Sequence, residues 1–257
     1  FVNIDSTTID GMKRAKRLEF PSKGTKLAQV VFTGFMPHAT HLLFNNINKA
    51  SLFALFRHPV DRAISLFYYL KDANWEPTYH PEWASMSLLD FLRQGDNVEH
   101  DWMVRNLVGV YDRKLNQTDL ELAKDILRTK VWVGLISEME ESLMRFGGIY
   151  GWSERKEWPR CIRNFAHHGS NKHMHPEVNS RSEEWHILRE ANYWDLQLYA
   201  YAVQLFEMQK QFFQEIESDD DFMKKSDDID EQELKAKTEN DSEFSTKEIR
   251  DEDATNS

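Results

Sequence analysis

The stretch from Ser51 to Leu70, SLFALFRHPVDRAISLFYYL, constrains the fold of this chain more than any other segment. Its first six residues form an apolar run, which predicts a buried strand. Arg57 and His58 follow directly, and Pro59 fits the first position of a helix, where a missing backbone N–H costs nothing. The sequence therefore predicts a strand–turn–helix unit with Arg57 at the carboxyl end of the strand, where open α/β sheets bind their ligands.

The predicted helix after Pro59 is suited to an anionic ligand at its N-terminus. Asp61 lies in the first turn, where the helix dipole favours an acid, and Ile64 and Phe67 supply an apolar face. Ser65 lies in the second turn. Arg57 and Ser65 are therefore both within reach of an anion held near the N-terminus of this helix.

The run from Arg57 to Ser65, RHPVDRAIS, resembles the 3′-phosphate-binding segment of sulfotransferases that use 3′-phosphoadenosine-5′-phosphosulfate. It is most similar to the membrane-anchored carbohydrate branch that includes the heparan and uronyl 2-O-sulfotransferases, although His58 stands where that family usually has Asp. The resemblance implies that Arg57, Arg62 and Ser65 bind the nucleotide, that a carbohydrate hydroxyl is sulfated, and that no metal is needed. The alternative is an ordinary helix that begins with proline and carries surface arginines.

Two further segments resemble the same family in the same order. VGLISEMEESLMRF (133–146) matches its strand-then-helix pattern, and NYWDLQLY (192–199) matches its closing helix, so the likeness spans roughly residues 27–213. The apolar run from Val131 to Ile136, VWVGLI, also predicts a buried strand. Strands that alternate with helices predict a three-layer α/β domain with a mainly parallel sheet. The resemblance refines this to the sulfotransferase architecture related to P-loop nucleotide kinases.

The position of the catalytic base departs from the family. A third buried strand is predicted from Leu27 to Thr33, and the family places its histidine base 22 residues before the arginine. In this chain that position holds Phe35, which cannot transfer a proton. His38, about one helical turn further on, is the candidate replacement, with His41 as the alternative. If neither acts as the base, the chain is a non-catalytic relative that binds nucleotide or glycan.

Other segments predict local structure and secondary contacts. A helix capped by Ser87 is expected in segment 87–94, and further helices are expected in segments 100–110 and 118–128 and after a cap at Ser137. One long helix is expected from Glu183 to Phe213. The aromatic loop between Asp72 and Ser85 is a candidate lip for a sugar acceptor, although ordinary packing is expected for any single aromatic residue in it. Arg105 is either a partner for an acidic sugar or a surface cation.

A polar stretch from Trp152 to Arg181 carries further basic residues. By the family resemblance, Lys172 and Arg181 belong to a loop that covers the nucleotide. The same stretch contains four histidines, at 167, 168, 173 and 175, but no cysteine or acid completes a familiar metal site, so a metal centre is not expected. The single cysteine, Cys161, excludes an internal disulfide.

Charge divides the chain into two regions. Residues 215–257 hold 17 acidic and 6 basic residues, whereas residues 1–214 hold 26 of each and are neutral, although the whole chain has a net charge of −11. We therefore predict a sulfotransferase domain over 1–214 and a disordered acidic tail over 215–257, either simply solvated or able to bind a basic partner.

The family resemblance also sets expectations about location. It implies a lumenal Golgi domain of a type II membrane protein, with the 5′-phosphosulfate loop and the membrane anchor upstream of Phe1. The sequons at Asn116 and Asn240 agree with a lumenal location, though such triplets also arise by chance. The expected partner is a carbohydrate acceptor such as a glycosaminoglycan, not a nucleic acid, and the oligomeric state is left open.

Overall fold

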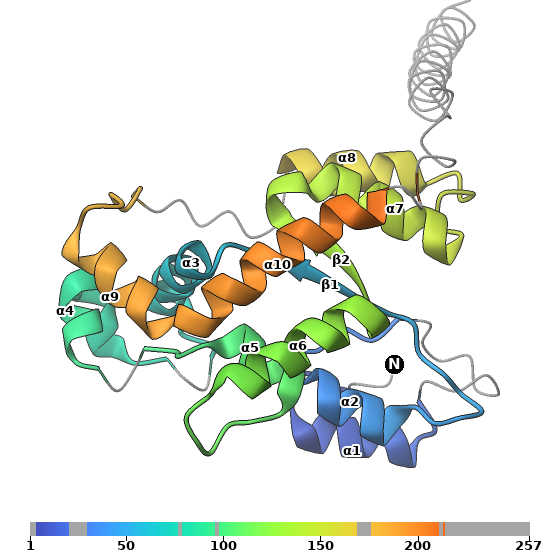
Figure 1. Ribbon diagram of the computed structural model, residues 1–257, viewed down its shortest axis with the longest axis horizontal. Coiled ribbons are helices and arrows are strands. Elements are labelled where there is room, and N and C mark those ends of the chain that lie inside the picture. The colour runs from blue at the N-terminus through green and yellow to red at the C-terminus, as the bar shows by residue number, and fades with distance from the viewer. Residues whose placement is uncertain are drawn as a thin grey trace, which may run out of the picture. The chain divides into compact units, whose positions relative to one another are not determined.

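The computed structural model of this 257-residue chain describes residues 4–20, 30–76, 79–95, 98–168, 176–210 and 213, without the side chains of 165–168. The described part is mainly helical (Figure 1). Its strands are β1 (Leu52–Phe56) and β2 (Val131–Leu135). Its helices are α1 (Ile9–Arg17), α2 (Met36–Leu43), α3 (Pro59–Asp72), α4 (Leu88–Arg93), α5 (Trp102–Val108), α6 (Gln117–Lys130), α7 (Met139–Tyr150), α8 (Trp158–His168), α9 (Glu183–Ala191) and α10 (Tyr193–Gln209), with short 3-10 helices η1 (Pro81–Ser85) and η2 (Ile136–Glu138).

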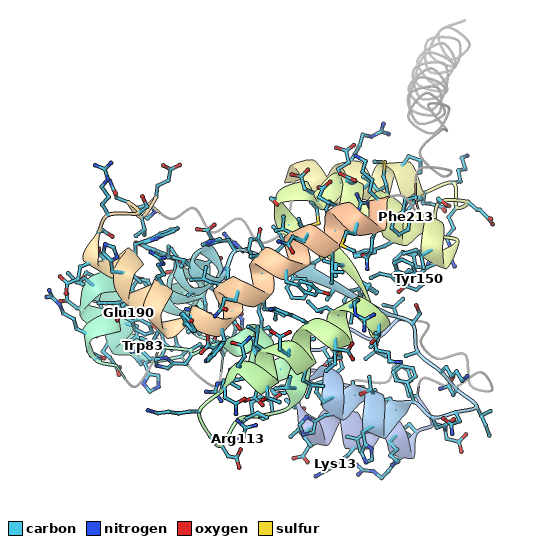
Figure 2. The ribbon with its side chains drawn as sticks, viewed as in Figure 1. Lys13, Trp83, Arg113, Tyr150, Glu190 and Phe213 are labelled. Atoms are coloured by element: carbon cyan, nitrogen blue, oxygen red, sulfur yellow. The ribbon has the colours of Figure 1, made fainter. Side chains whose placement is uncertain are left out.

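The chain forms two compact units. Among the described residues, those within Phe1–Ser142 and Asn171–Gln209 form the first unit, and those within Leu143–Ser170 and Lys210–Ser257 form the second. In the second unit, Tyr150, labelled in Figure 2, packs against Trp152 with ring centroids 5.0 Å apart. Trp152 also packs against Trp158, at 5.6 Å between centroids. The sheet and the candidate site belong to the first unit. The predicted acidic tail, residues 215–257, lies outside the described residues.

The two strands form a parallel pair. Leu52 lies opposite Val131, and the register continues to Phe56 opposite Leu135. Both strands lie within the apolar runs that predicted them, 51–56 and 131–136. Parallel neighbours require a long crossover, which helices α3 to α6 supply here. The combination of helices with a parallel sheet agrees with the predicted α/β class.

Two side chains form hydrogen bonds with backbone groups of β2 that are not paired with β1. The side-chain amide of Gln209, at the end of α10, accepts the N–H of Val133 at 3.1 Å and donates to the carbonyl of Val131 at 3.3 Å. The hydroxyl of Ser142 accepts the N–H of Leu135 at 2.9 Å. These bonds satisfy backbone groups that a further strand would otherwise pair with, so this edge is protected.

Helices α5, α6 and α10 build the main core against the sheet. Helix α10 passes across both strands in Figure 1 and contributes Leu198, Ala202 and Phe206, which are fully buried. Helix α3 packs with η1, α4 and α9 in a second core around Phe67 and Trp83. Helices α1 and α2 share a third, small core.

The structure corrects a predicted strand and a predicted helix start. Val30 to Thr33, the described part of the predicted strand Leu27–Thr33, is not a strand, and residues 27–29 lie outside the described residues. Ser137 does not start a helix as its cap but lies inside η2, and α7 begins at Met139. In the aromatic loop between Asp72 and Ser85, Trp83 is only 6 % exposed and packs in the second core, whereas Trp75 is 67 % exposed.

The predicted single helix from Glu183 to Phe213 is also wrong. Helix α9 ends at Ala191 and α10 begins at Tyr193, with Asn192 between them. In an unbroken helix the N–H of Asp195 would donate to the carbonyl of Ala191. Instead that carbonyl accepts the N–H of Asp101 at 3.2 Å, and the Asp195 N–H donates to the Asp101 carboxylate at 3.2 Å. A tertiary contact from the start of α5 therefore splits the helix.

Candidate anion-binding site at the end of strand β1

The turn between β1 and α3 holds Arg57 at the carboxyl end of the strand. Phe56, Pro59 and Val60 on either side are buried, and they anchor the turn between the sheet and the second core. Arg57 itself is half-buried, and within the described residues its side chain makes no hydrogen bond or ion pair. A guanidinium at the start of a helix has the charge and the N–H donors that can bind an anion.

His58 is the N-cap residue of α3 and is fixed by aromatic neighbours. Its ring stacks on Trp185 of α9 at 5.7 Å between centroids, with a 16° interplanar angle, and meets Tyr199 of α10 edge-on at 5.5 Å. Its buried Nδ1 has no hydrogen-bond partner, since the nearest oxygen of Asp61 lies 3.9 Å away, too far for a hydrogen bond. These ring contacts hold the turn that carries Arg57.

Ser65 and Arg62 lie on α3 but differ in their partners. Ser65 is half-buried one turn after Asp61, and within the described residues its hydroxyl forms no hydrogen bond. Arg62 donates from Nη2 to Glu99 at 2.7 Å, and its guanidinium lies 4.7 Å above the Trp102 ring. Ser65 is therefore available to a ligand, whereas Arg62 would bind one only in addition to, or in exchange for, Glu99.

His38 lies in a different cluster. It is in the first turn of α2, whose N-cap is Phe35, and its ring contacts Phe35 at 6.2 Å and Tyr111 at 6.5 Å between centroids. Its Nδ1 is buried without a hydrogen-bond partner. In the described part of the chain, no hydrogen bond, ion pair or ring contact joins His38 to Arg57. His41 on the same helix is exposed.

Several predicted site residues fall outside what the structure describes. Lys172, His173 and His175 lie in the segment 169–175, and the side chains of 167 and 168 are likewise not described. Arg181 is described and exposed. Among the described residues, no three His, Cys, Asp or Glu side chains are grouped closely enough to hold a metal ion. No helix in the described ranges is both long enough and apolar enough to cross a membrane.

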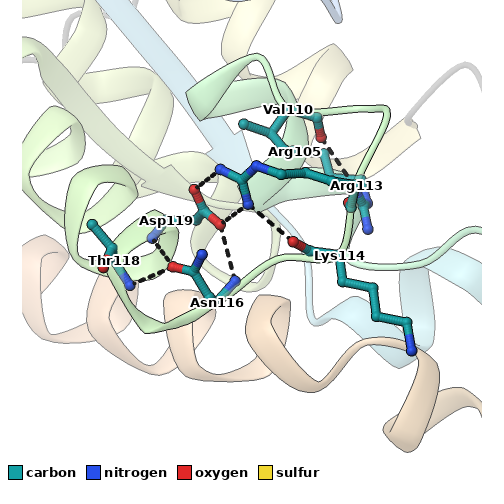
Figure 3. Close-up of polar contacts among 7 residues, drawn as sticks. All are labelled: Arg105, Val110, Arg113, Lys114, Asn116, Thr118 and Asp119. Atoms are coloured by element: carbon teal, nitrogen blue, oxygen red, sulfur yellow. Dashed lines mark hydrogen bonds and ion pairs between the residues drawn. The ribbon is translucent and has the colours of Figure 1, made fainter.

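Arg105 holds a loop together. Its guanidinium donates to the backbone carbonyls of His100, Val110 and Arg113, at 2.9, 3.0 and 2.9 Å. The bonds to Val110 and Arg113 tie α5 to the loop that follows it (Figure 3), and the bond to His100 ties α5 to the segment before it. Neither interpretation from the sequence, a partner for an acidic sugar or a surface cation, included these hydrogen bonds to backbone carbonyls.

The same loop ends in an ion pair at the start of α6. Arg113 donates to both oxygens of Asp119 at 2.7 Å (Figure 3), and Asn116 caps the helix. The hydrogen bond from Arg113 holds the pKa of Asp119 below its ordinary value, although burial opposes this. The loop between α5 and α6 is therefore fixed at both ends.

A pair of buried carboxylates was not found by sequence reasoning. Asp195 accepts the N–H groups of Met103 and Val104, both at 2.8 Å, and so caps α5, while Asp101 accepts the N–H groups of Trp194 at 2.7 Å and Asp195 at 3.2 Å and caps α10. We call this arrangement the reciprocal cap. Burial raises the pKa of both carboxyls, that of Asp195 to about 7. The partners lie more than 90 residues apart, so no local pattern signals the contact.

Comparison of the chain with protein-family models, with curated proteins and with solved structures found no match.

Proposed function

We propose that this chain is a sulfotransferase that transfers a sulfuryl group from 3′-phosphoadenosine-5′-phosphosulfate to a carbohydrate hydroxyl. The observation that supports this most is Arg57, half-buried at the carboxyl end of β1 and without a protein partner among the described residues. Ser65, on the helix that follows, has the family's spacing from Arg57. The related proposals are a P-loop-kinase-like architecture and a lumenal Golgi location.

The proposed roles follow from the chemistry of the nucleotide. Arg57 would bind the 3′-phosphate through paired N–H donors, since a guanidinium matches phosphate geometry. Ser65 would donate one further hydrogen bond, and the free N–H groups in the first turn of α3 would add their partial positive charge. Lys172 is proposed to cover the nucleotide. In the reaction, the bond between sulfur and the phosphate oxygen breaks and a sulfate ester forms, while the acceptor hydroxyl loses its proton to a base.

Arg57→Ala tests the nucleotide site. Loss of a charged hydrogen bond weakens binding by roughly 1.5–3 kcal/mol, or about ten- to a hundredfold in affinity. The measurement is calorimetric titration with adenosine 3′,5′-bisphosphate. Arg57→Lys, which keeps the charge but loses the paired geometry, is expected to lie between wild type and alanine. Arg93→Ala is the control, because Arg93 is exposed and pairs with Glu183.

Wild-type protein that binds no bisphosphate, or an Arg57→Ala affinity equal to that of the Arg93→Ala control, would overturn the assignment of Arg57.

Phe35 favours a second candidate, a relative that binds nucleotide or glycan without catalysis. It occupies the position of the family's base, and its ring is packed against His38. If His38 is the base, His38→Ala should reduce sulfate transfer by about a hundredfold or more while nucleotide binding is kept. His41→Ala is the matched control on the same helix.

If the wild type binds nucleotide but transfers no sulfate, the non-catalytic function is supported, and Phe35→His is then expected to raise transfer. Transfer that survives replacement of both histidines would contradict both versions of the proposal.

A further inference from the structure

The sequon Asn116-Gln117-Thr118 lies where the loop between α5 and α6 meets the start of α6. All three residues are exposed. Asn116 has an extended backbone, with φ −140° and ψ 179°, and is the N-cap residue of the helix. An N-linked oligosaccharide requires such an acceptor on the surface of a loop in a protein that enters the secretory pathway.

In the side-chain amide of Asn116, Oδ1 caps the helix, whereas Nδ2 has no role in the cap. Oδ1 accepts the N–H of Thr118 at 2.9 Å and the N–H of Asp119 at 3.3 Å, which is the capping interaction. In Figure 3 no dashed line reaches Nδ2, and no hydrogen bond from it is formed in the described part of the chain. Glycosylation uses only Nδ2, so a glycosylated Asn116 keeps the acceptor that caps α6.

We propose that Asn116 carries an N-linked oligosaccharide. In this step Nδ2 forms a bond to the anomeric carbon of a lipid-linked oligosaccharide, the bond from that carbon to the pyrophosphate oxygen breaks, and the amide loses one proton as the lipid pyrophosphate leaves. The inference depends on the proposed function in one respect, because only a lumenal protein meets the enzyme that performs this transfer. Folding does not oppose it, since the helix cap and the Arg113–Asp119 pair leave Nδ2 unused.

One substitution, Gln117→Pro, removes the sequon without replacing the acceptor asparagine. Gln117 is the first residue of α6, the position where proline is favoured, and the extended backbone of Asn116 is the conformation that a residue before proline adopts. Gln117→Pro therefore keeps Asn116, Thr118 and the helix, but it destroys the sequon, which excludes proline at the middle position. Asn116→Asp keeps the capping oxygen and removes the amide. Thr118→Ser keeps the sequon and is the positive control.

The experiment uses the full protein purified from its own cells, together with the three variants expressed there. Peptide-N-glycosidase F in heavy-oxygen water is expected to lower the apparent mass of wild type and Thr118→Ser by one oligosaccharide and to convert Asn116 to labelled Asp. Gln117→Pro and Asn116→Asp should lack that mass shift and keep wild-type thermal stability.

An unlabelled Asn116 peptide overturns the proposal, as does a shift at Asn116 that persists in Gln117→Pro. Bisphosphate binding by the same preparations separates the two failures. Nucleotide binding without a glycan at Asn116 refutes only the glycosylation site. A glycan at Asn116 without nucleotide binding refutes only the proposed function. A glycan at Asn240 alone shows that the protein is lumenal but that Asn116 is not the acceptor.

Discussion

The reciprocal cap between α5 and α10 makes the stability of the fold depend on the charge of Asp195. This carboxyl is fully buried (0 % exposed) and accepts the N–H groups of Met103 and Val104. Burial raises its pKa from an ordinary value of 3.8 to about 7; the two N–H groups and Arg62 act in the opposite direction, and the charge of Asp101 adds to the increase. Asp195→Asn keeps the side-chain volume and removes the titration.

The direction of the pH effect follows from proton binding. Between about pH 4 and 7 the unfolded chain has released a proton that the folded chain still holds, so the stability falls as the pH rises through this window and is level above it. One proton corresponds to about 1.4 kcal/mol per pH unit, which gives an upper bound of ~4 kcal/mol over the window. In Asp195→Asn the amide nitrogen faces one of the two N–H donors, and leaving that donor unpaired costs about 1–3 kcal/mol at every pH.

Urea unfolding at a series of pH values between about 4.5 and 8 measures both effects. We expect Asp195→Asn to be less stable than wild type at the acidic end, with a gap that closes by several kcal/mol toward pH 8. Glu207→Gln on the exposed side of α10 serves as the control and should follow wild type. A gap that stays constant, or widens toward pH 8, would show that Asp195 is ionised in the folded protein and that its N–H donors outweigh burial.

Other contacts give further predictions. Gln209→Ala removes both side-chain bonds to the edge of β2 and should cost about 1–3 kcal/mol in urea unfolding, with an unchanged m-value; no loss would show that water replaces the amide. Because the pKa of Asp119 is lowered, its contribution to stability is present above about pH 4 and is lost as the pH falls, so Asp119→Asn should flatten the acid limb of an unfolding curve. Deleting residues 215–257 should leave the melting temperature nearly unchanged, and a large decrease would show that the tail packs.

Local sequence patterns predicted the elements that depend mainly on their own residues. Two of the three apolar runs predicted as strands form β1 and β2, to within one residue at their ends, whereas the described part of the third run, residues 30–33, forms no strand. Pro59 marked the start of α3, and Ser87 was predicted as the cap of α4, where its hydroxyl accepts the Asp90 N–H. Arg57 was placed correctly at the strand exit because a side chain that directly follows a strand has its position fixed by that strand.

Other features were decided by contacts between segments that lie far apart in the sequence. The helix predicted from Glu183 onward has an apolar pattern that continues through Asn192, yet it breaks there because Asp101 takes the N–H groups at the start of α10. Arg105 looked like a surface cation because the carbonyls it binds carry no signal in side-chain chemistry. The burial that raises the pKa of Asp195 is likewise a property of packed helices. The sequence by itself therefore determined where the strands, the anchored turn and Arg57 lie, while only the tertiary structure decided where a helix stops and which charges are buried, because hydrogen-bond partners and solvent exclusion come from the rest of the fold.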